Sequence, residues 1–468
     1  MVKKSTGTDA TVHAVRSMSS GACERASEGL FQQVSSAVLE VLPRSDQRRA
    51  GAEYLHGLLE ADGRKSARNL AAHSGGQANE QSLHHFVNAS SWDWSAARRA
   101  LARRVTESWT PSVWVARPVV IPKSGAGAVG VNRRFVPALG RAVNAQQVVG
   151  LWVASPSVNC PVNWRIHLTG SWLADAGQRS RCAVPETARA ESLHECLVET
   201  VLETATAWGL ESRPVVLDAR GADVGWALRR LRAAGLSVLV RVDPEQRLVS
   251  PPAPRDGGRR IATAGELHRV LRGTRRTAAP WVDRGEDGEM SAGVVVAAGR
   301  VLLADGLIPA QRSAPGAGTA SATGTASATH GGNAGNVGNS RMSNVTPIGR
   351  RPAARRIGPS APEEFSLLAI EERGCAEPQL WLTDLTDAPL LTLFRMSTLI
   401  QQVDADYDRI GDRVGLRDFT GRSYAGWHRH ATLASAAYAV EALTRAHRQD
   451  RAAPRGGRLR QLGGLRAA

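Results

Sequence analysis

The segment from Arg213 to Val242 constrains the fold of this chain more than any other. It contains an apolar stretch that ends in Asp218, the helical pattern GWALRRLRAAGL and a second apolar stretch, SVLVRV. A strand, a helix and a strand in this order predict a sheet that is at least partly parallel. Asp218 then lies at the carboxyl end of a strand, where α/β folds place their chemistry. We therefore predict an α/β fold with Asp218 at its functional edge.

Two different patterns precede this unit. Residues 29–108 carry apolar side chains at helical intervals, for example Leu30, Val34 and Val38, and predict a basic, all-helical N-terminal domain. Residues 109–247 change to β-rich segments separated by glycine and proline turns, namely SVWVARPVVI, QVVGLWVAS and NWRIHLTGSW. The amphipathic stretch SLHECLVETVLETATAWGL adds a helix before Asp218. We expect residues 109–247 to form the first part of the α/β core.

The remaining boundaries follow changes in composition. The repeated hexamer GTASAT lies in a long segment of small and polar residues, which bury too little surface to offset the entropy of ordering. In chain order we predict a disordered tail at residues 1–28, a β-rich insert at 248–305, a low-complexity linker at 306–362, the C-terminal part of the core at 363–447 and a basic tail at 448–468.

The charge balance points to a polyanionic partner. Lysine and arginine number 59 against 43 aspartates and glutamates, which gives a formal net charge of +16. A field of this sign favours nucleic acid. We therefore expect double-stranded DNA as the partner.

Cysteine spacing and hydropathy argue against other classes. Cys23, Cys160, Cys182, Cys196 and Cys375 are widely spaced and form no CxxC pair, which disfavours a zinc site or a disulfide framework. The first residues lack the apolar stretch of a signal peptide, and no run of about 18 apolar residues occurs. We expect a cytoplasmic protein without a membrane partner, associated with the nucleoid through DNA.

Basic residues that could contact DNA phosphates lie in two clusters and one turn. The run ARRALARR predicts a basic helix face, GRSYAGWHRH interleaves bases with Tyr424 and Trp427, and PKSG carries a single lysine. The predicted DNA-binding residues are Arg98, Arg99, Arg103, Arg104, Lys123, Arg422, His428, Arg429 and His430. The alternatives are a solvated helix face for the first cluster and a helix start capped by Ser423 for the second.

Six segments in chain order resemble the DDE transposases of bacterial insertion sequences. They are SDQRRAGAEYLHGLLEADGRKS, LHHFVNASSWDW, PKSG followed by VGV, CPVNWRIHL, VVLDARGAD and GLRDFTGRSYAGWHRHATL, and they span most of residues 45–445. The resemblance implies a ribonuclease-H-like mixed sheet with helices, an N-terminal helical domain and a β-rich insert. It also implies three carboxylates that hold two Mg²⁺ ions against a DNA phosphate, since Mg²⁺ prefers oxygen ligands.

Two of the three acidic motifs are retained in part. Asp218 and Asp223 match the spacing of the second motif, and the third motif places its acid at Asp404. Asp406 and Asp408 lie within a few residues, so the register of the third motif stays open between these acids. The family's Arg-Trp pair and lysine around that acid are replaced, by Ile400, Gln401 and Gly411.

The first acidic motif is lost. The family's Asp-Asp-Thr aligns to Arg117, Pro118 and Val119, and no acidic residue lies between Glu107 and Lys123. Unit charges about 4 Å apart interact by roughly 4 kcal/mol at an effective dielectric of about 20, so an arginine here repels a divalent ion strongly. We expect no metal cofactor, with the arginine forming an ion pair with the remaining acids instead.

Three functional hypotheses follow. The first is a transposase-derived DNA-binding protein that no longer cuts, with Asp218 and Asp404 as catalytic remnants, recruited as a regulator or left as a decaying copy. The second is an active DDE transposase that binds Mg²⁺ through Asp218 and Asp404. The third is a scaffold reused for protein contacts. The resemblance further implies a homodimer, because such transposases work as dimers.

Overall fold

The computed structural model describes residues 25–74, 79–250, 259–271, 276–279, 294–304, 364–372, 375 and 377–452. The predicted linker at 306–362, most of the predicted tail at 1–28 and most of the basic tail at 448–468 lie outside these residues.

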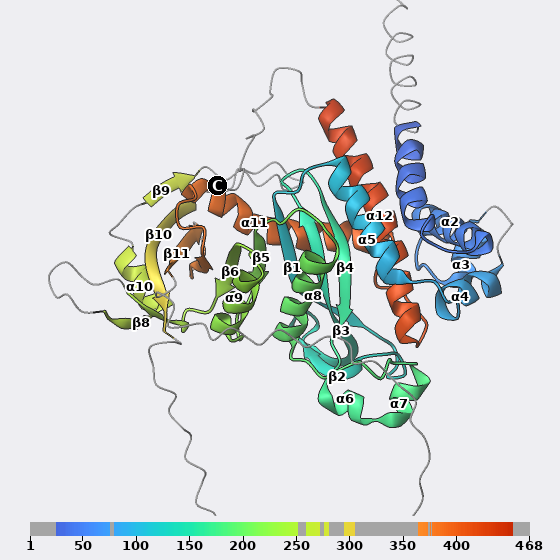
Figure 1. Ribbon diagram of the computed structural model, residues 1–468, viewed down its shortest axis with the longest axis horizontal. Coiled ribbons are helices and arrows are strands. Elements are labelled where there is room, and N and C mark those ends of the chain that lie inside the picture. Colours follow the sequence, from blue (N-terminus) through green and yellow to red (C-terminus); the bar gives the residue numbers. More distant parts are fainter. Residues whose placement is uncertain are drawn as a thin grey trace, which may run out of the picture.

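The N-terminal block is helical, as predicted. Residues 25–39 form a helix, followed by α2 (Ser45–Glu60), α3 (Ala67–Ala72), α4 (Glu80–Asn88) and α5 (Trp94–Ser108). Side chains of Ser66, Asn79 and Asp93 accept backbone N–H groups at the starts of α3, α4 and α5, which satisfies donors that a helix start leaves free. Helices α2, α4 and α5 pack against the long C-terminal helix α12 (Tyr424–Ala452) (Figure 1). The N-terminal helices and the end of the chain therefore share one core.

The central sheet is mixed. It contains β1 (Val113–Pro122), β2 (Val131–Val136), β3 (Arg141–Ala154), β4 (Asn159–Ile166), β5 (Val215–Asp218) and β6 (Val238–Val242). Strands β1, β5 and β6 are parallel, whereas β3 is antiparallel to β1, β2 and β4. The predicted strand, helix and strand are β5, α9 (Val224–Ala233) and β6. The α/β fold and the ribonuclease-H-like order of its strands agree with the sequence prediction.

The sheet continues beyond β6. Its outer strands are β12 (Gln379–Thr383), β11 (Glu364–Glu372), β10 (Val294–Leu303), β7 (Arg247–Val249) and β8 (Ile261–Thr263), with β9 (Arg276–Ala279) paired to β10 and α10 (Ala264–Leu271) beside them. Strands of the predicted insert thus hydrogen-bond to β11, and through β12 they extend the core sheet to 12 strands. Figure 1 shows these strands beside the core.

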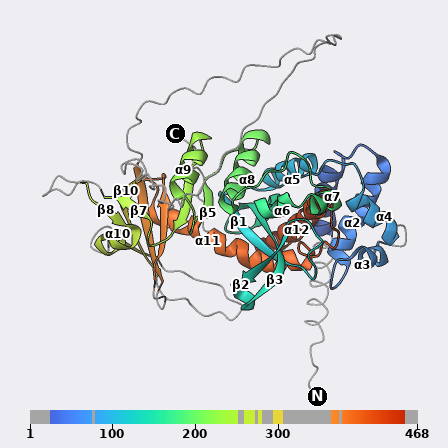
Figure 2. The same ribbon diagram turned by 90° about the horizontal axis from the view of Figure 1, so that it is seen from below.

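Helices cover both faces of the sheet. Helix α8 (Leu193–Ala207) contacts β1, β3 and β4, and α9 contacts β6. Helix α11 (Leu390–Asp406) lies across the other face, against β1, β5 and β6 (Figure 2). Short elements complete the fold: η1 (Pro137–Leu139), α6 (Gly170–Ala174), α7 (Ala176–Arg181) and the π-helical turn η2 (Tyr407–Gly411). Within the described residues, no helix is both long and apolar enough to span a bilayer.

Candidate functional site beside Arg117 and Asp218

The residues that the sequence analysis aligned with the three acidic motifs, Arg117, Asp218 and Asp404, come together beside β1 and β5. Ala116 of β1 pairs with Leu217 of β5, so the next residues along these parallel strands, Arg117 and Asp218, are neighbours. Helix α11 crosses both strands and carries Asp404 near its end. Residues about 100 and 190 positions apart in the chain therefore converge, as the strand order requires.

Arg117 and Asp404 form an ion pair between Nη1 and Oδ1. The Arg117 side chain is 19% exposed and that of Asp404 is 50% exposed. The guanidinium carbon of Arg117 also lies 5.3 Å from the ring centre of Tyr407 and 5.8 Å from that of Trp152. Aromatic faces attract cations, so both rings favour a charged arginine at this position.

Neighbouring groups act on the pKa of Asp404 in opposite directions. Burial raises the pKa of this carboxyl above its usual value, Arg117 opposes the rise, and the charges of Asp408 and Asp218 add to it. Asp218 follows Leu217, the partner of Ala116, so it lies on the same side of the sheet as Arg117 and Asp404. Without Arg117, Asp404 would lose its ion-pair partner and keep its neighbouring acids.

Asp218 has an arginine partner of its own. Arg220 Nε donates to Asp218 Oδ1 at 2.9 Å, and Arg220 Nη2 donates to Oδ2 at 2.6 Å. The two parallel bonds give the geometry in which arginine binds carboxylates most strongly. The neighbouring acid of the motif, Asp223, caps α9 by accepting the N–H of Trp226 at 2.8 Å. The aspartate spacing of the second motif thus serves an ion pair and a helix cap.

The third motif has its acid beside Arg117 at Asp404. Asp406 instead accepts from Asn159 Nδ2 at 2.5 Å and pairs with Arg409, and Asp408 pairs with Arg417. Of the three acids left open by the sequence, Asp404 is the one paired with Arg117, beside the end of β5.

A comparison with known protein families identifies the family of this chain. A family model described as DDE superfamily endonuclease matches residues 37–285, which is more than half of the 468 residues. The chain belongs to the DDE superfamily endonucleases. No curated protein matches it.

The acids of this DDE superfamily member do not fit a pair of divalent ions. Arg117, which the sequence analysis aligned with the first ligand, is a cation, and Asp218 and Asp404 each bind an arginine. Within the described ranges, no group of three or more histidine, cysteine, aspartate or glutamate side chains is arranged to hold a metal ion. A metal ion here would have to displace one arginine and approach another, at a cost of several kcal/mol for each unit charge.

The ion pairs continue beyond the strand ends. Arg417 Nη1 lies 3.0 Å from Asp412 Oδ1, its Nη2 pairs with Asp408, and its guanidinium carbon lies 4.5 Å from the ring centre of Tyr407. Tyr407 is therefore in contact with two arginines, Arg117 and Arg417. This network of ion pairs was not predicted from the sequence. The sequence feature that could have indicated it is the spacing of four residues between Asp404, Asp408 and Asp412, which places acids on one helical face.

Lys123 of the PKSG turn binds the protein itself. Its Nζ donates to the carbonyls of Phe419 at 2.9 Å and Arg417 at 3.3 Å. Burial, with a smaller effect from Arg64, lowers the pKa of this lysine to about 8. Lys123 thus connects the turn after β1 to the loop with the sequence GLRDF, residues 415–419.

Four of the predicted DNA-binding residues lie in the interior: Arg98, His428, Arg429 and His430. Arg98 Nε donates to Thr432 Oγ1 at 2.9 Å, and its Nη1 donates to the carbonyl of Trp164 at 2.8 Å. Arg429 donates to the carbonyls of Val87 and Trp92, both at 3.2 Å. Both arginines therefore hydrogen-bond across the seam between the N-terminal helices, the core and α12.

The two histidines of this group are also part of that seam. The ring of His428 stacks on Trp94 with 5.2 Å between ring centres. His430 Nδ1 lies 2.8 Å from Tyr54 Oη, and burial lowers the pKa of this histidine to about 4. In this fold the four buried side chains have no surface to offer a phosphate. The sequence could not show this, because basic residues on a helix are usually solvated.

The other basic residues reach the surface. Arg103 and Arg422 are exposed, and Arg99 and Arg104 are partly exposed. Arg103 Nη2 donates to the carbonyl of Trp208 at 3.3 Å, and Arg104 pairs with Gln33 and lies 3.8 Å from Glu107. These four arginines remain available to an anionic partner.

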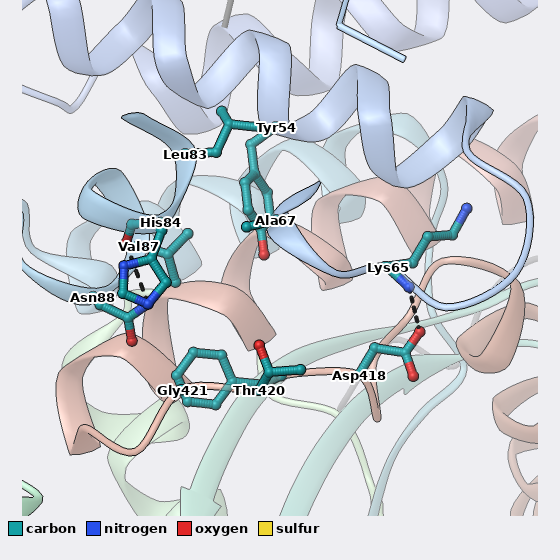
Figure 3. A pocket seen from close by; sticks show the side chains of 11 residues that line it. Tyr54, Lys65, Ala67, Leu83, His84, Val87, Asn88, Asp418, Thr420 and Gly421 are labelled. Carbon is teal, nitrogen blue, oxygen red and sulfur yellow. Dashed lines mark hydrogen bonds between the residues drawn. The ribbon is translucent and has the colours of Figure 1, made fainter. Parts of the chain in front are cut away.

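A small cavity lies where the N-terminal helices meet the GLRDF loop (Figure 3). Tyr54, Asn88 and Asp418 are among its lining residues, and the backbone N–H of Lys65 donates to Asp418 Oδ2 at 2.8 Å. Its volume is about 20 Å³. A single water needs roughly 10–15 Å³ measured in this way. The cavity therefore fits a bridging water and is too small for a substrate.

Proposed function

We propose that this DDE superfamily member binds double-stranded DNA and does not cut it. The observation that carries the proposal is the ion pair between Arg117 and Asp404, which occupies the edge where the family's metal ligands are expected. A positive side chain at the first ligand position repels divalent ions, and it neutralises the acid that would attract them.

DNA as the partner is supported by family membership and by charge. The formal net charge of +16 favours a polyanion, and Arg99, Arg103, Arg104 and Arg422 reach the surface. We exclude the four buried bases of the seam from this interface. Binding through phosphates makes affinity strongly dependent on salt, with a logarithmic slope of about −0.9 for each phosphate contact.

Such a protein acts by occupying DNA, as a regulator or as a remnant that competes for the sites of active relatives. We propose that it is associated with the nucleoid in the cytoplasm and works as a homodimer. Light scattering of the purified protein, alone and with a duplex, tests the dimer.

Two assays on the same protein test the main proposal. Gel shifts with long duplex DNA at 50 and 200 mM salt are expected to give binding that weakens steeply with salt. Incubation of the same DNA with Mg²⁺ or Mn²⁺ is expected to leave it uncut. Metal-dependent cleavage that requires Asp218 would contradict the proposal, and absence of binding at low salt would favour a scaffold for protein contacts.

An active transposase remains the second hypothesis, because Asp218 and Asp404 still face one edge of the sheet and influence each other. Activity would require Arg117 to leave its ion pair and both aromatic rings. It would also require another acid to take the first ligand position.

A further inference from the structure

The β2–β3 hairpin extends beyond the body of the sheet. Strand β1 ends at Pro122, which pairs with Ala145, whereas β3 begins four residues earlier, at Arg141. The other hairpin strand, β2, is the edge of the sheet. The tip is the η1 turn, closed by Gly140 in the left-handed region with φ of 59°. Figure 2 shows the hairpin projecting from the lower side of the molecule.

The end of this hairpin exposes apolar side chains. Phe135 is 64% exposed and Leu139 is 46% exposed, whereas Val131 at the base of the same strand is buried. Pro137, between them, is also exposed. Within the described residues, Phe135 is the aromatic member of a small set of exposed large apolar side chains. Exposed apolar side chains gathered at the end of a projecting element mark a candidate contact surface.

Arginines flank the apolar tip on both faces of the hairpin. Arg133 lies on the same face as Phe135, because the two are two residues apart on one strand. Arg141 pairs with Val136 and lies on the opposite face with Arg134, which donates to Gln147. Arg133 and Arg141 are exposed, and no ion pair is observed for either within the described residues.

The hairpin and the strands beside it carry no acidic residue of their own. No acidic residue occurs in the sequence between Glu107 and Asp175, a stretch that includes all of β1, β2, β3 and β4. An apolar tip between arginines, on a hairpin without acidic residues, is complementary to a polyanion that also has an apolar interior. A duplex has both properties, because phosphates line its grooves and stacked bases lie between them.

We propose that the tip of the β2–β3 hairpin enters the minor groove of duplex DNA, with Phe135 and Leu139 against a base step and Arg133 and Arg141 on the flanking phosphates. This inference rests on the proposed function and assigns it a surface. Apolar side chains inserted in this way unstack a base step and bend the duplex. The hairpin is therefore a DNA-bending element as well as a source of affinity.

The hairpin is separate from the edge that carries Arg117. Arg117 pairs with Gly150 of β3, nine residues from Arg141, which corresponds to about 30 Å along a strand. Changes at the tip therefore leave the Arg117–Asp404 ion pair untouched. The exposure of the tip also makes substitutions there compatible with folding.

Two double variants with matched controls test the proposal. Phe135→Ala with Leu139→Ala removes the apolar tip, and its control is Ile261→Ala with Val270→Ala, which removes exposed apolar side chains from the far end of the sheet. Arg133→Ala with Arg141→Ala removes two positive charges. Its control, Arg259→Ala with Arg260→Ala, removes the same charge from exposed positions near β8.

The measurements are gel-shift affinity at several salt concentrations and energy transfer between dyes at the two ends of a short duplex. We expect the apolar variant to lose most of the bend and about tenfold in affinity, with an unchanged salt slope. We expect the arginine variant to reduce the salt slope by about 2, because two phosphate contacts are lost. Both controls should bind and bend DNA within twofold of the unaltered protein.

The outcomes separate the two proposals. If the unaltered protein does not bind DNA, the proposed function fails and this inference with it. If it binds and both hairpin variants behave like their controls, only the inference fails. If the apolar variant abolishes self-association in light scattering and keeps its DNA affinity and bend, the tip contacts a second copy of the chain and the inference is also overturned.

Discussion

Arg117 of β1 and Asp404 of α11 form an ion pair just beyond the last residues that β1 pairs with β5. The family resemblance predicts the first acidic position at this arginine and the third at this aspartate. A cation supplied by the chain thus occupies the edge where the family's acids would attract metal ions. The arrangement satisfies the remaining acids without a metal, and its energetics differ for the two partners.

Removing the arginine is expected to cost more than removing the acid. Arg117→Met keeps contact with Tyr407 and Trp152 but leaves Asp404 beside Asp218 and Asp408 with no cation, so we expect a loss of about 1–2 kcal/mol. Asp404→Asn removes a carboxylate that burial already disfavours, and we expect a loss below about 1 kcal/mol. Urea unfolding at neutral pH measures both, with Arg259→Met as an exposed control.

The pH dependence of Asp404 gives an independent test. Its pKa is raised in the folded protein above the usual 3.8, mainly by burial, so the folded state holds this proton more tightly than the unfolded state. The resulting stabilisation is present at low pH and is lost as the pH rises above about 4 through the raised value. The stability of the unaltered protein relative to Asp404→Asn should therefore fall between pH 4 and pH 7 in urea unfolding. A constant difference across that range would contradict the shift.

Local patterns predicted the elements around the site well. The strand, helix and strand from Arg213 to Val242 fixed the parallel pairing of β5 and β6, and family spacing placed Asp218 and Asp404 at one edge. The predicted strands and helix are confirmed, because the periodicity that indicates them is a local property of the chain. The ion pair of Arg117 was also anticipated, since an arginine next to two acids has few other ways to satisfy them.

Long-range packing was not predictable from one sequence. Arg98 and Arg429 lie in basic segments of the kind that bind DNA. Their hydrogen-bond acceptors are nevertheless hundreds of residues away in the chain: Arg98 donates to Thr432, and Arg429 donates to Val87. The extension of the core sheet by β10 and β11 likewise depends on pairing between segments separated by the low-complexity stretch. No local sequence pattern indicates which buried carbonyl group will accept a hydrogen bond from a given arginine.

Substitutions of two arginines of α5, Arg98 and Arg103, are expected to have different effects: the first on stability and the second on DNA binding. Arg98→Ala leaves several buried acceptors without a donor, and we expect a loss of about 3 kcal/mol in the free energy of unfolding. Arg103 is exposed on the same helix, so Arg103→Ala should change stability by less than about 0.5 kcal/mol. If Arg103 contacts a phosphate, its loss reduces the salt slope of DNA binding by about 0.9. Thermal unfolding and gel shifts on both variants measure these effects.

The last prediction concerns catalysis. Asp218 accepts hydrogen bonds from the exposed Arg220, so Asp218→Asn should leave DNA affinity within about twofold of the unaltered protein. Pro118→Asp alone should not produce cleavage with Mg²⁺ or Mn²⁺, because Arg117 still forms its ion pair with Asp404.

The double variant Arg117→Asp with Pro118→Asp removes that cation and is the most favourable variant for metal binding. Even here we expect no cleavage, since the family resemblance predicts that Ile400, Gln401 and Gly411 stand where the third motif has basic and aromatic residues. Nicking of supercoiled DNA by the double variant, lost again on Asp218→Asn, would show instead that Arg117 alone suppresses an otherwise intact nuclease site.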